Sequence, residues 1–293
     1  MIDGLVVIDK PAGWTSHDVV ARCRRIFAQR RVGHAGTLDP DATGVVLVGL
    51  GRATRLMRYL SVLPKTYVGE LVLGVSTSTL DAAGEETGRW DMGGVTLAEA
   101  RRAAAALTGD ILQIPPMVSA LKVGGRRLHE LAREGKEVER AARPVQVSRF
   151  DLTIAVDPAD PGTARFAFGV DCSSGTYVRT LAADLGTALG GGGHIRTLRR
   201  RSVGQWTEAA AVALDDAGPD HVHSMADMLG HLDRLVAGPA AAVAVGHGKV
   251  LERDGLGATG SGPWAVLDED GLLLAVYEAH GRATKPAVVV AAQ

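Results

Sequence analysis

The stretch GHAGTLDPDATG, residues 33–44, is the most informative part of this 293-residue chain. It places one histidine and two aspartates among three glycines, between an arginine-rich segment and an apolar run. An Asp-Pro pair is typical of turns, so the stretch is expected to be a loop. Leu38 and Pro40 flank Asp39 and can shelter its carboxylate from water. Burial would raise the pKa of that carboxyl, so a nearby cation would be needed to keep it ionised.

The segments on either side of this loop predict strands and a helix. Residues 5–9 (LVVID) are typical of a short buried strand, and the break at 10–13 precedes Ser16, which is expected to cap a helix. The run VVLVGL at 45–50 predicts another buried strand. Apolar residues at helical spacing would bury one face of the helix and leave basic residues outside it. The apolar residues are Val19, Val20, Cys23, Ile26 and Phe27, and the basic ones are Arg22, Arg24, Arg25, Arg30 and Arg31.

The chain beyond this unit predicts mixed helices and strands without regular alternation, which favours an α+β fold. Thr96 and Glu99 have the spacing of a capping box, so a helix is expected from there to Gly109. A second, amphipathic helix is expected at 179–189, before the glycines at 190–193. Strands are expected at 67–75, 145–156, 164–172 and 196–205.

Two further regions differ from this core. Residues 111–140 contain Pro-Pro and Gly-Gly pairs with a basic cluster at Lys122, Arg126 and Arg127, which favours an excursion from the core. It is either a mobile loop that grips a substrate or an ordinary surface hairpin and helix. After about residue 235, short apolar runs alternate with glycine-rich turns, and Asp270-Gly271 is a hairpin signal. This tail, residues 236–293, predicts a small β-barrel domain.

The charge is distributed unevenly. The formal net charge is −1, but residues 1–210 hold 27 Lys and Arg against 22 Asp and Glu, whereas residues 211–293 hold 5 against 11. A polyanion is therefore expected to bind the first part. Only six of the 32 basic residues are lysines, so arginines would supply most phosphate contacts, although a biased genome composition explains the arginine content equally well.

Cysteine content and hydropathy exclude several classes of protein. Cys23 and Cys172 are the only cysteines, too few for a disulfide framework or a four-cysteine zinc site. No metal is expected. The chain has no run of 18 apolar residues and no signal-peptide pattern at its start, so a cytoplasmic protein without membrane contact is expected.

Five ordered stretches resemble the TruB family of pseudouridine synthases. The stretch at 33–44 resembles the family's motif II, whose G-x-L-D-P sequence contains the catalytic aspartate. A lone G-x-L-D-P would be a weak signal, but five matches in order over residues 4–204 are specific. The other four are IDKPAGWTSHDVV at 8–20, KTYVGELVLGVSTSTLDAAGE at 65–85, CSSGTYVRTLAADLG at 172–186 and HIRTLRR at 194–200.

The resemblance implies a fold and a reaction. The fold would be α+β, with a mixed central sheet flanked by helices in a catalytic domain at 1–235, a thumb-like insertion at about 111–140, and a PUA-like domain at 236–293. The reaction would isomerise the T-loop uridine at position 55 of tRNA by base flipping, glycosidic C–N cleavage, base rotation and C5–C1′ bond formation. No cofactor would be needed. The enzyme would act on the T-arm as a monomer without a protein partner, and assistance to tRNA folding is a further expectation.

The resemblance also assigns roles to individual residues. Asp39 would be the catalytic carboxylate, Tyr67 would stack on the flipped uracil, and Arg179 would be the cation that pairs with Asp39. Without the resemblance, Tyr67 would be expected to pack in the core and His34 to be an ordinary turn histidine. The remaining RNA-binding residues implied by the resemblance are His34, Tyr177 and Leu198 at the flipped base, and Lys122, Arg126 and Arg127 in the thumb, where His129 stands at a position that is often tyrosine in relatives.

Three other functions fit parts of the sequence. A dyskerin-like subunit of an RNA-protein complex is less favoured because the chain lacks basic extensions and has its own insertion. A module that only binds and folds tRNA would leave Asp39, Tyr67 and Arg179 without a use. A metabolic enzyme with Asp39 as general base is disfavoured because the chain has no phosphate-loop or dinucleotide motif.

Overall fold

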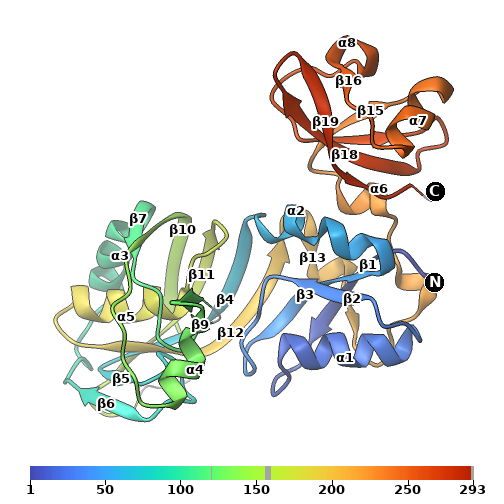
Figure 1. The fold of residues 1–293 in the computed structure, drawn as a ribbon. Helices are drawn as coiled ribbons and strands as arrows, with labels where there is room; N and C mark the ends of the chain where they lie inside the picture. Colours follow the sequence, from blue (N-terminus) through green and yellow to red (C-terminus); the bar gives the residue numbers. More distant parts are fainter. Residues whose placement is uncertain (120, 156–159, 292–293) are drawn as a thin grey trace.

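The computed structural model describes residues 1–119, 121–155 and 160–291, without the side chains of Lys122, Arg127, His129 and Arg133. Figure 1 shows a broad lower part and a smaller C-terminal part above one end of it. The lower part is built on one ten-stranded mixed sheet and the smaller part on a five-stranded sheet. The α+β prediction is therefore confirmed.

The large sheet runs in the order β14-β1-β3-β12-β4-β11-β10-β7, with β2 beside β3 and β13 beside β12. Its strands are β1 (Gly4–Lys10), β2 (Val32–Ala35), β3 (Thr43–Leu50), β4 (Lys65–Leu73), β7 (Gly109–Gln113), β10 (Arg143–Ile154), β11 (Ala164–Cys172), β12 (Gly193–Val203), β13 (Trp206–Thr207) and β14 (Val212–Ala213). The helices around it are α1 (Ser16–Ile26), α2 (Met57–Ser61), α3 (Leu97–Ala106) and α5 (Val178–Ala188), with short 3₁₀ turns at Gly51–Leu56 (η1), Glu208–Ala210 (η2) and Pro219–His221 (η3).

Strand β12 joins the two halves of this sheet. It pairs with β4 along its length but with β3 only through Arg199 and Arg200, which face Thr43 and Gly44. The two strands can approach there because residue 44 is glycine: its φ is +103°, and a Cβ would lie 2.2 Å from the carbonyl oxygen of Arg200. The loop at residues 36–42, which we call the aspartate loop, ends immediately before this junction.

The first half of the sheet is buried on both faces. Val46 and Val48 of β3 pack in the cluster that includes α1, whereas Val45 and Leu47 pack with η1, α2 and the C-terminal sheet. Alternate side chains of a strand point to opposite faces, so a continuous apolar run is required where both faces are covered. The second half carries α3 and α5, whose apolar faces join the same cluster as α1.

Several boundaries differ from the sequence expectations. Thr15, not Ser16, caps α1, and Asp18 completes a capping box with it. The Ser16 hydroxyl instead accepts a hydrogen bond from the backbone N–H of Leu38 at 2.9 Å and donates to the carbonyl of Leu38 at 3.1 Å. Helix α3 has the expected capping box at Thr96 but ends at Ala106, before Gly109. The strand expected at 67–75 divides at Gly74 (φ +102°) into β4 and β5 (Val75–Thr77), which forms a hairpin with β6 (Glu86–Arg89).

The excursion expected at residues 111–140 is an insertion between two adjacent strands, β7 and β10. Gln113 at the end of β7 faces Arg143 at the start of β10, so the chain leaves and re-enters the sheet at the same place. Between them lie β8 (Lys122–Val123), β9 (Arg126–Arg127) and α4 (Leu128–Arg133). The arrangement is a hairpin followed by a short helix, carried on the second half of the sheet.

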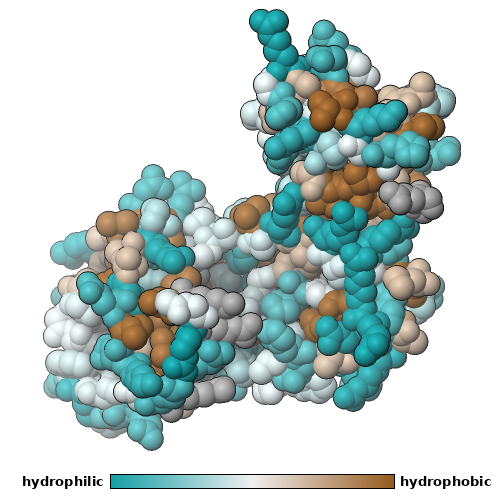
Figure 2. Space-filling model, viewed as in Figure 1, coloured by the Kyte–Doolittle hydropathy of each residue, from teal (hydrophilic) through white to brown (hydrophobic). Residues whose placement is uncertain are grey.

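The C-terminal sheet has the order β15-β17-β18-β19-β16, and its end strands do not pair with each other in the described residues, so the expected closed barrel does not form. Strand β15 begins at Asp233, so this sheet extends across the expected boundary at 235/236. Figure 2 shows hydrophobic side chains around α6 (Met225–Met228), where the two parts meet. The other elements are β15 (Asp233–Val236), α7 (Pro239–Gly246), β16 (Leu251–Glu252), α8 (Arg253–Leu256), β17 (Trp264–Leu267), β18 (Leu273–His280) and β19 (Ala283–Val289).

Candidate active site

The aspartate loop is held at both sides by buried polar groups. Ser16 at the start of α1 donates to and accepts from the backbone of Leu38. Lys10, which is fully buried at the end of β1, donates from Nζ to the carbonyl oxygen of Pro40 at 2.7 Å and to those of Pro11 and Trp14. Asp39 lies between these two anchored residues, so its position is determined by the packing of α1 and β1.

Asp39 forms an ion pair with Arg179 from the first turn of α5, and the two groups approach through both carboxylate oxygens. Arg179 Nε lies 2.9 Å from Oδ2, and Nη2 lies 3.2 Å from Oδ1. The guanidinium also donates to the carbonyl oxygens of Thr79 (2.7 Å) and Val118 (2.8 Å) and lies 3.6 Å from Asp81. With all these contacts the Arg179 side chain is only 5% exposed, whereas that of Asp39 is 39% exposed. One side of the carboxylate thus remains accessible.

The environment of Asp39 changes its proton affinity. Burial raises the pKa of its carboxyl above the ordinary value, and Asp81 adds to this, while the positive charge of Arg179 opposes it. The cation that the sequence required near Asp39 is therefore Arg179.

A cavity of about 270 Å³ opens beside this ion pair. Sites for drug-sized ligands have volumes of roughly 300–1,000 Å³. This cavity lies just below the lower end of that range, so its size suits a ligand with a single ring. Its walls contain five of the nine site residues named from the sequence: Asp39, Tyr67, Tyr177, Arg179 and Leu198. They come from the aspartate loop, β4, the start of α5 and β12, so the cavity lies where the two halves of the sheet meet.

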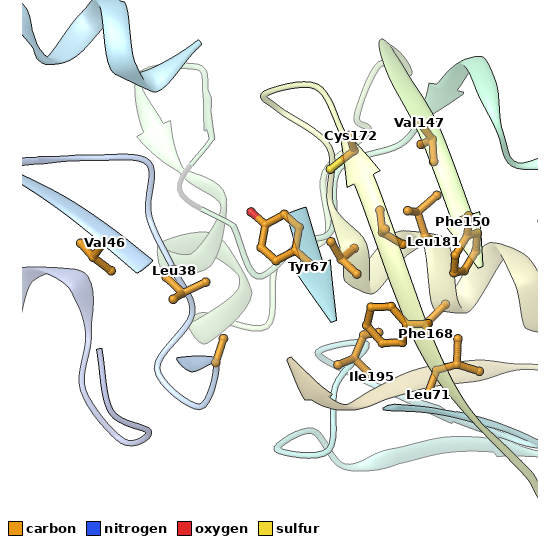
Figure 3. Close-up of a cluster of buried hydrophobic side chains, with 14 of the residues drawn as sticks. Leu38, Val46, Tyr67, Leu71, Val147, Phe150, Phe168, Cys172, Leu181 and Ile195 are labelled. Carbon is orange, nitrogen blue, oxygen red and sulfur yellow. The ribbon is translucent and has the colours of Figure 1, made fainter. Parts of the chain in front are cut away.

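Tyr67 lies between the two halves of the large sheet. Figure 3 shows its ring between Leu38 on one side and the cluster containing Phe168 and Ile195 on the other, with the hydroxyl turned away from that cluster. Burial raises the pKa of this hydroxyl, so it is neutral at pH 7. Tyr67 therefore belongs both to the core, as its sequence setting alone suggested, and to the cavity wall.

Tyr177 is positioned by a residue that sequence reasoning missed. The side chain of Gln113, which is 1% exposed, accepts from the backbone N–H of Tyr177 at 2.9 Å and donates to its carbonyl at 3.2 Å. Since Gln113 is the last residue before the insertion, the start of α5 and the base of the insertion are held together.

Two of the other expected RNA-binding residues, His34 and Arg126, are not among the residues that line this cavity. His34 is on β2, with its ring edge-on to that of His17 at 5.3 Å, and burial lowers its pKa to about 4, so it is neutral at pH 7. Arg126 forms an ion pair with Glu134 inside the insertion. The side chains of Lys122 and Arg127 are outside the described part of the structure.

A second cavity of about 460 Å³ adjoins the first and shares Asp39, Arg179 and Leu198 with it. Val118 of the insertion lines this cavity and Ser119 lines the first, so the insertion begins at the site. In the described residues, no three His, Cys, Asp or Glu side chains group closely enough to hold a metal ion. No helix there is long and apolar enough to cross a membrane.

Four more charged side chains belong to the site although the sequence analysis assigned them no role. Asp81 contacts Arg179, Lys10 holds the aspartate loop, and Lys65 and Arg200 line the smaller cavity. All four occur within the stretches quoted for the family resemblance, which was the available signal.

Comparisons with known proteins identify the family of this chain. A family profile described as "TruB family pseudouridylate synthase (N terminal domain)" matches residues 24–178, and one described as "tRNA pseudouridylate synthase B C-terminal domain" matches residues 179–237. A "tRNA pseudouridine synthase B" of Thermobifida fusca is 46% identical over 297 residues, covering 99% of both chains. One of Mycobacterium sp. (strain KMS) is 46% identical over 290 residues, covering 98% of this chain and 96% of the relative.

The solved structures give the same fold. The chain of a Cbf5-Nop10-Gar1 complex has a TM-score of 0.73 and 26% identity, covering 99% of this chain and 84% of that one. A chain of an H/ACA RNP bound to a substrate RNA containing 2′-deoxyuridine has the same TM-score at 24% identity, covering 99% and 85%. The fold is thus shared with these structures over nearly the whole of this chain.

Proposed function

Because the chain belongs to the TruB family of pseudouridylate synthases, we propose that it isomerises the T-loop uridine at position 55 of tRNA, with Asp39 as the catalytic carboxylate. The observation that carries this proposal is the Asp39–Arg179 ion pair, which keeps one side of the carboxylate open to a cavity of the size of a single ring. Tyr67 and Leu198 form apolar walls on which a flipped uracil can stack.

The reaction requires the base to leave the RNA stack, break from C1′ at N1, turn, and rejoin at C5. The cost of extrusion, about a few kcal/mol, is offset when side chains contact the flipped base. Detachment and rejoining within one closed site depend on positioning, which the anchored loop and the anchored start of α5 supply. No cofactor enters this scheme.

We propose that the protein acts alone, as a cytoplasmic monomer, on the T-arm of tRNA. The chain aligns over nearly its full length with relatives named tRNA pseudouridine synthase B at 46% identity, against 26% for the Cbf5 chain that is solved with Nop10 and Gar1. The insertion at residues 114–142 starts at the cavity and would close over the RNA, with Arg126 and its neighbours near the phosphates. The C-terminal sheet would be PUA-like.

Tritium release tests this function directly. An isolated T-arm hairpin labelled with tritium at C5 of the target uridine should lose the label to water, because C5 exchanges its hydrogen for the bond to C1′. Since structured RNA is recognised mainly through shape and unpaired bases, the hairpin and the full tRNA should both react. Binding of both RNAs without release would favour an RNA-folding protein, and a requirement for the whole tRNA would contradict recognition of the T-arm alone.

The pKa of Asp39 gives a pH dependence. A raised pKa means that the carboxyl keeps its proton to a higher pH than an ordinary aspartate does. If the ionised carboxylate is the reactive form, the single-turnover rate should fall on the acidic side with a midpoint above the ordinary aspartate value. The rate should be measured at saturating RNA, with binding checked at each pH. A rate that stays constant down to the ordinary aspartate pKa would contradict the assignment.

A further inference from the structure

Two buried cations, Lys65 and Arg200, line the smaller cavity on the side of Tyr67. Their exposed fractions are 7% and 0%. Neither pairs with a carboxylate in the described residues, whereas Arg179 has both Asp39 and Asp81. Burying a charge without a counter-ion is costly, so this arrangement is unusual unless the charge is used.

Both cations are held only by neutral groups. Lys65 Nζ donates to the carbonyl oxygens of Ser61 (3.1 Å) and Leu63 (2.7 Å). Arg200 donates from Nε to the carbonyl of Val45 at 2.7 Å, and its two Nη atoms reach the aspartate-loop carbonyls of residues 36 and 37 at 3.2 and 3.4 Å. These hydrogen bonds fix the positions of the Lys65 ammonium and the Arg200 guanidinium. They do not neutralise the positive charge of either group, because the acceptors are uncharged carbonyl oxygens.

The titratable neighbours do not neutralise them either. Cys172 lies beside Lys65, but burial raises the pKa of its thiol to about 11. Burial likewise raises the pKa of the Tyr67 hydroxyl, although the charge of Arg200 opposes this, so the hydroxyl is neutral at pH 7. The wall of the cavity formed by Lys65, Tyr67 and Arg200 is therefore electropositive when the cavity is empty.

The reaction creates a negative charge that this wall fits. When the C1′–N1 bond breaks, its electron pair stays on the base, which becomes a uracil anion with charge shared by N1, O2 and O4. C5 then bonds to C1′, the C5 proton leaves, and N1 gains a proton, so the product is neutral again. Groups that are fixed in advance where charge develops can stabilise it without reorganisation.

We propose that Lys65 and Arg200 stabilise the uracil anion during the time that it is detached from the ribose. This inference rests on the proposed function. It adds a pair of cations, Lys65 and Arg200, to the Asp39–Arg179 ion pair. Asp39 and Arg179 would act at the sugar side, and Lys65 and Arg200 at the base side. The anion would also be retained by the same charges, which would limit its escape before C5 attacks.

Lys65 is the better residue to test, because Arg200 also supports the aspartate loop. Lys65→Met keeps the length of the side chain and removes its charge, Lys65→Arg keeps the charge, and Lys285→Met on the C-terminal sheet is the matched control. Each variant is measured in single turnover on a T-arm hairpin with uridine or 4-thiouridine at the target position. Sulfur carries negative charge better than oxygen does, so 4-thiouracil depends less on an external cation.

We expect Lys65→Met to slow the uridine reaction by roughly 100-fold, the order of magnitude found when one fixed stabilising group is removed. The slowing with 4-thiouridine should be at least about tenfold smaller, Lys65→Arg should restore most of the rate, and Lys285→Met should match wild type. Equal slowing on both RNAs would show a merely structural role and would overturn the proposal. If wild type and Lys65→Met were equally active, the role of Lys65 would be overturned while the proposed function would stand. If wild type itself were inactive, the proposed function would be overturned.

The pH profile gives a second readout that does not need 4-thiouridine. Burial and the charge of Arg200 lower the pKa of Lys65 to about 8. The wild-type rate should therefore fall above about pH 8, as Lys65 loses its proton, while Lys65→Arg should keep its rate to higher pH. Burial also lowers the pKa of Lys10 to about 8, and Lys10 is present in both proteins, so the difference between the two profiles is what reports on Lys65. Identical profiles in the two proteins would overturn the proposal.

Discussion

Asp39→Asn should abolish tritium release from the labelled T-arm while leaving RNA affinity unchanged. Asparagine has the shape of aspartate and keeps an oxygen that can accept from Arg179, but it has no negative charge with which to attack carbon or remove a proton. Because loss of a reacting group removes an entire chemical step, we expect the single-turnover rate to fall by at least about 10³-fold. The comparison should be made at RNA concentrations that saturate both proteins.

Asp41→Asn is the matched control for this change. Asp41 lies two residues away in the same loop, is exposed, lines only the larger cavity and not the one that would hold the base, and forms no ion pair in the described residues. Asp41→Asn, like Asp39→Asn, removes one negative charge from the aspartate loop. It should change the single-turnover rate by less than about tenfold. A large loss in both variants would mean that loop charge matters rather than the reactive carboxylate, and an active Asp39→Asn would refute the assignment of Asp39.

Arg179→Lys should give the second-largest loss, although the charge is conserved. Lysine is a single point donor and cannot bond both oxygens of Asp39 while also reaching the carbonyls of Thr79 and Val118. Asp39 would lose its fixed direction, and the positive charge that opposes its raised pKa would be held less closely to it. We expect a decrease of roughly 10²–10³-fold in the single-turnover rate, with the acidic limb of the pH profile moved to higher pH.

Arg149→Lys is a suitable control for that experiment. Arg149 on β10 also bonds two carboxylates, Asp151 at 2.9 Å and Asp171 at 2.7 Å, but it lies outside the walls of both site cavities. Its replacement disrupts a comparable ion-pair network and should leave the rate within about twofold of wild type. If Arg179→Lys were no slower than Arg149→Lys, the guanidinium contacts to both oxygens of Asp39 would be unimportant for the reaction.

Local sequence patterns predicted most elements of the large sheet because each pattern reports a local cause. The apolar run at 45–50 requires two covered faces, and the capping box at Thr96 satisfies the free N–H groups of a helix start. The same reasoning failed where a long-range contact prevailed. Ser16 looks like a helix cap, but its hydroxyl bonds Leu38, and Thr15 takes the cap. The barrel expected at the C-terminus failed because alternating short strands do not determine whether a sheet closes.

By itself, the sequence determined the family and the α+β class and predicted which aspartate is catalytic, because motifs of adjacent residues are visible without coordinates. It even indicated that Asp39 needs a cation. The family resemblance named Arg179 as that cation, but only the tertiary structure shows the contact, since Arg179 lies 140 residues away and is brought to Asp39 by the joining of the two half-sheets at β12. The same joining buries Lys65 and Arg200, which have no carboxylate partner within the described part of the chain. Burial and pairing depend on which distant segments meet, and no spacing along the chain contains that information.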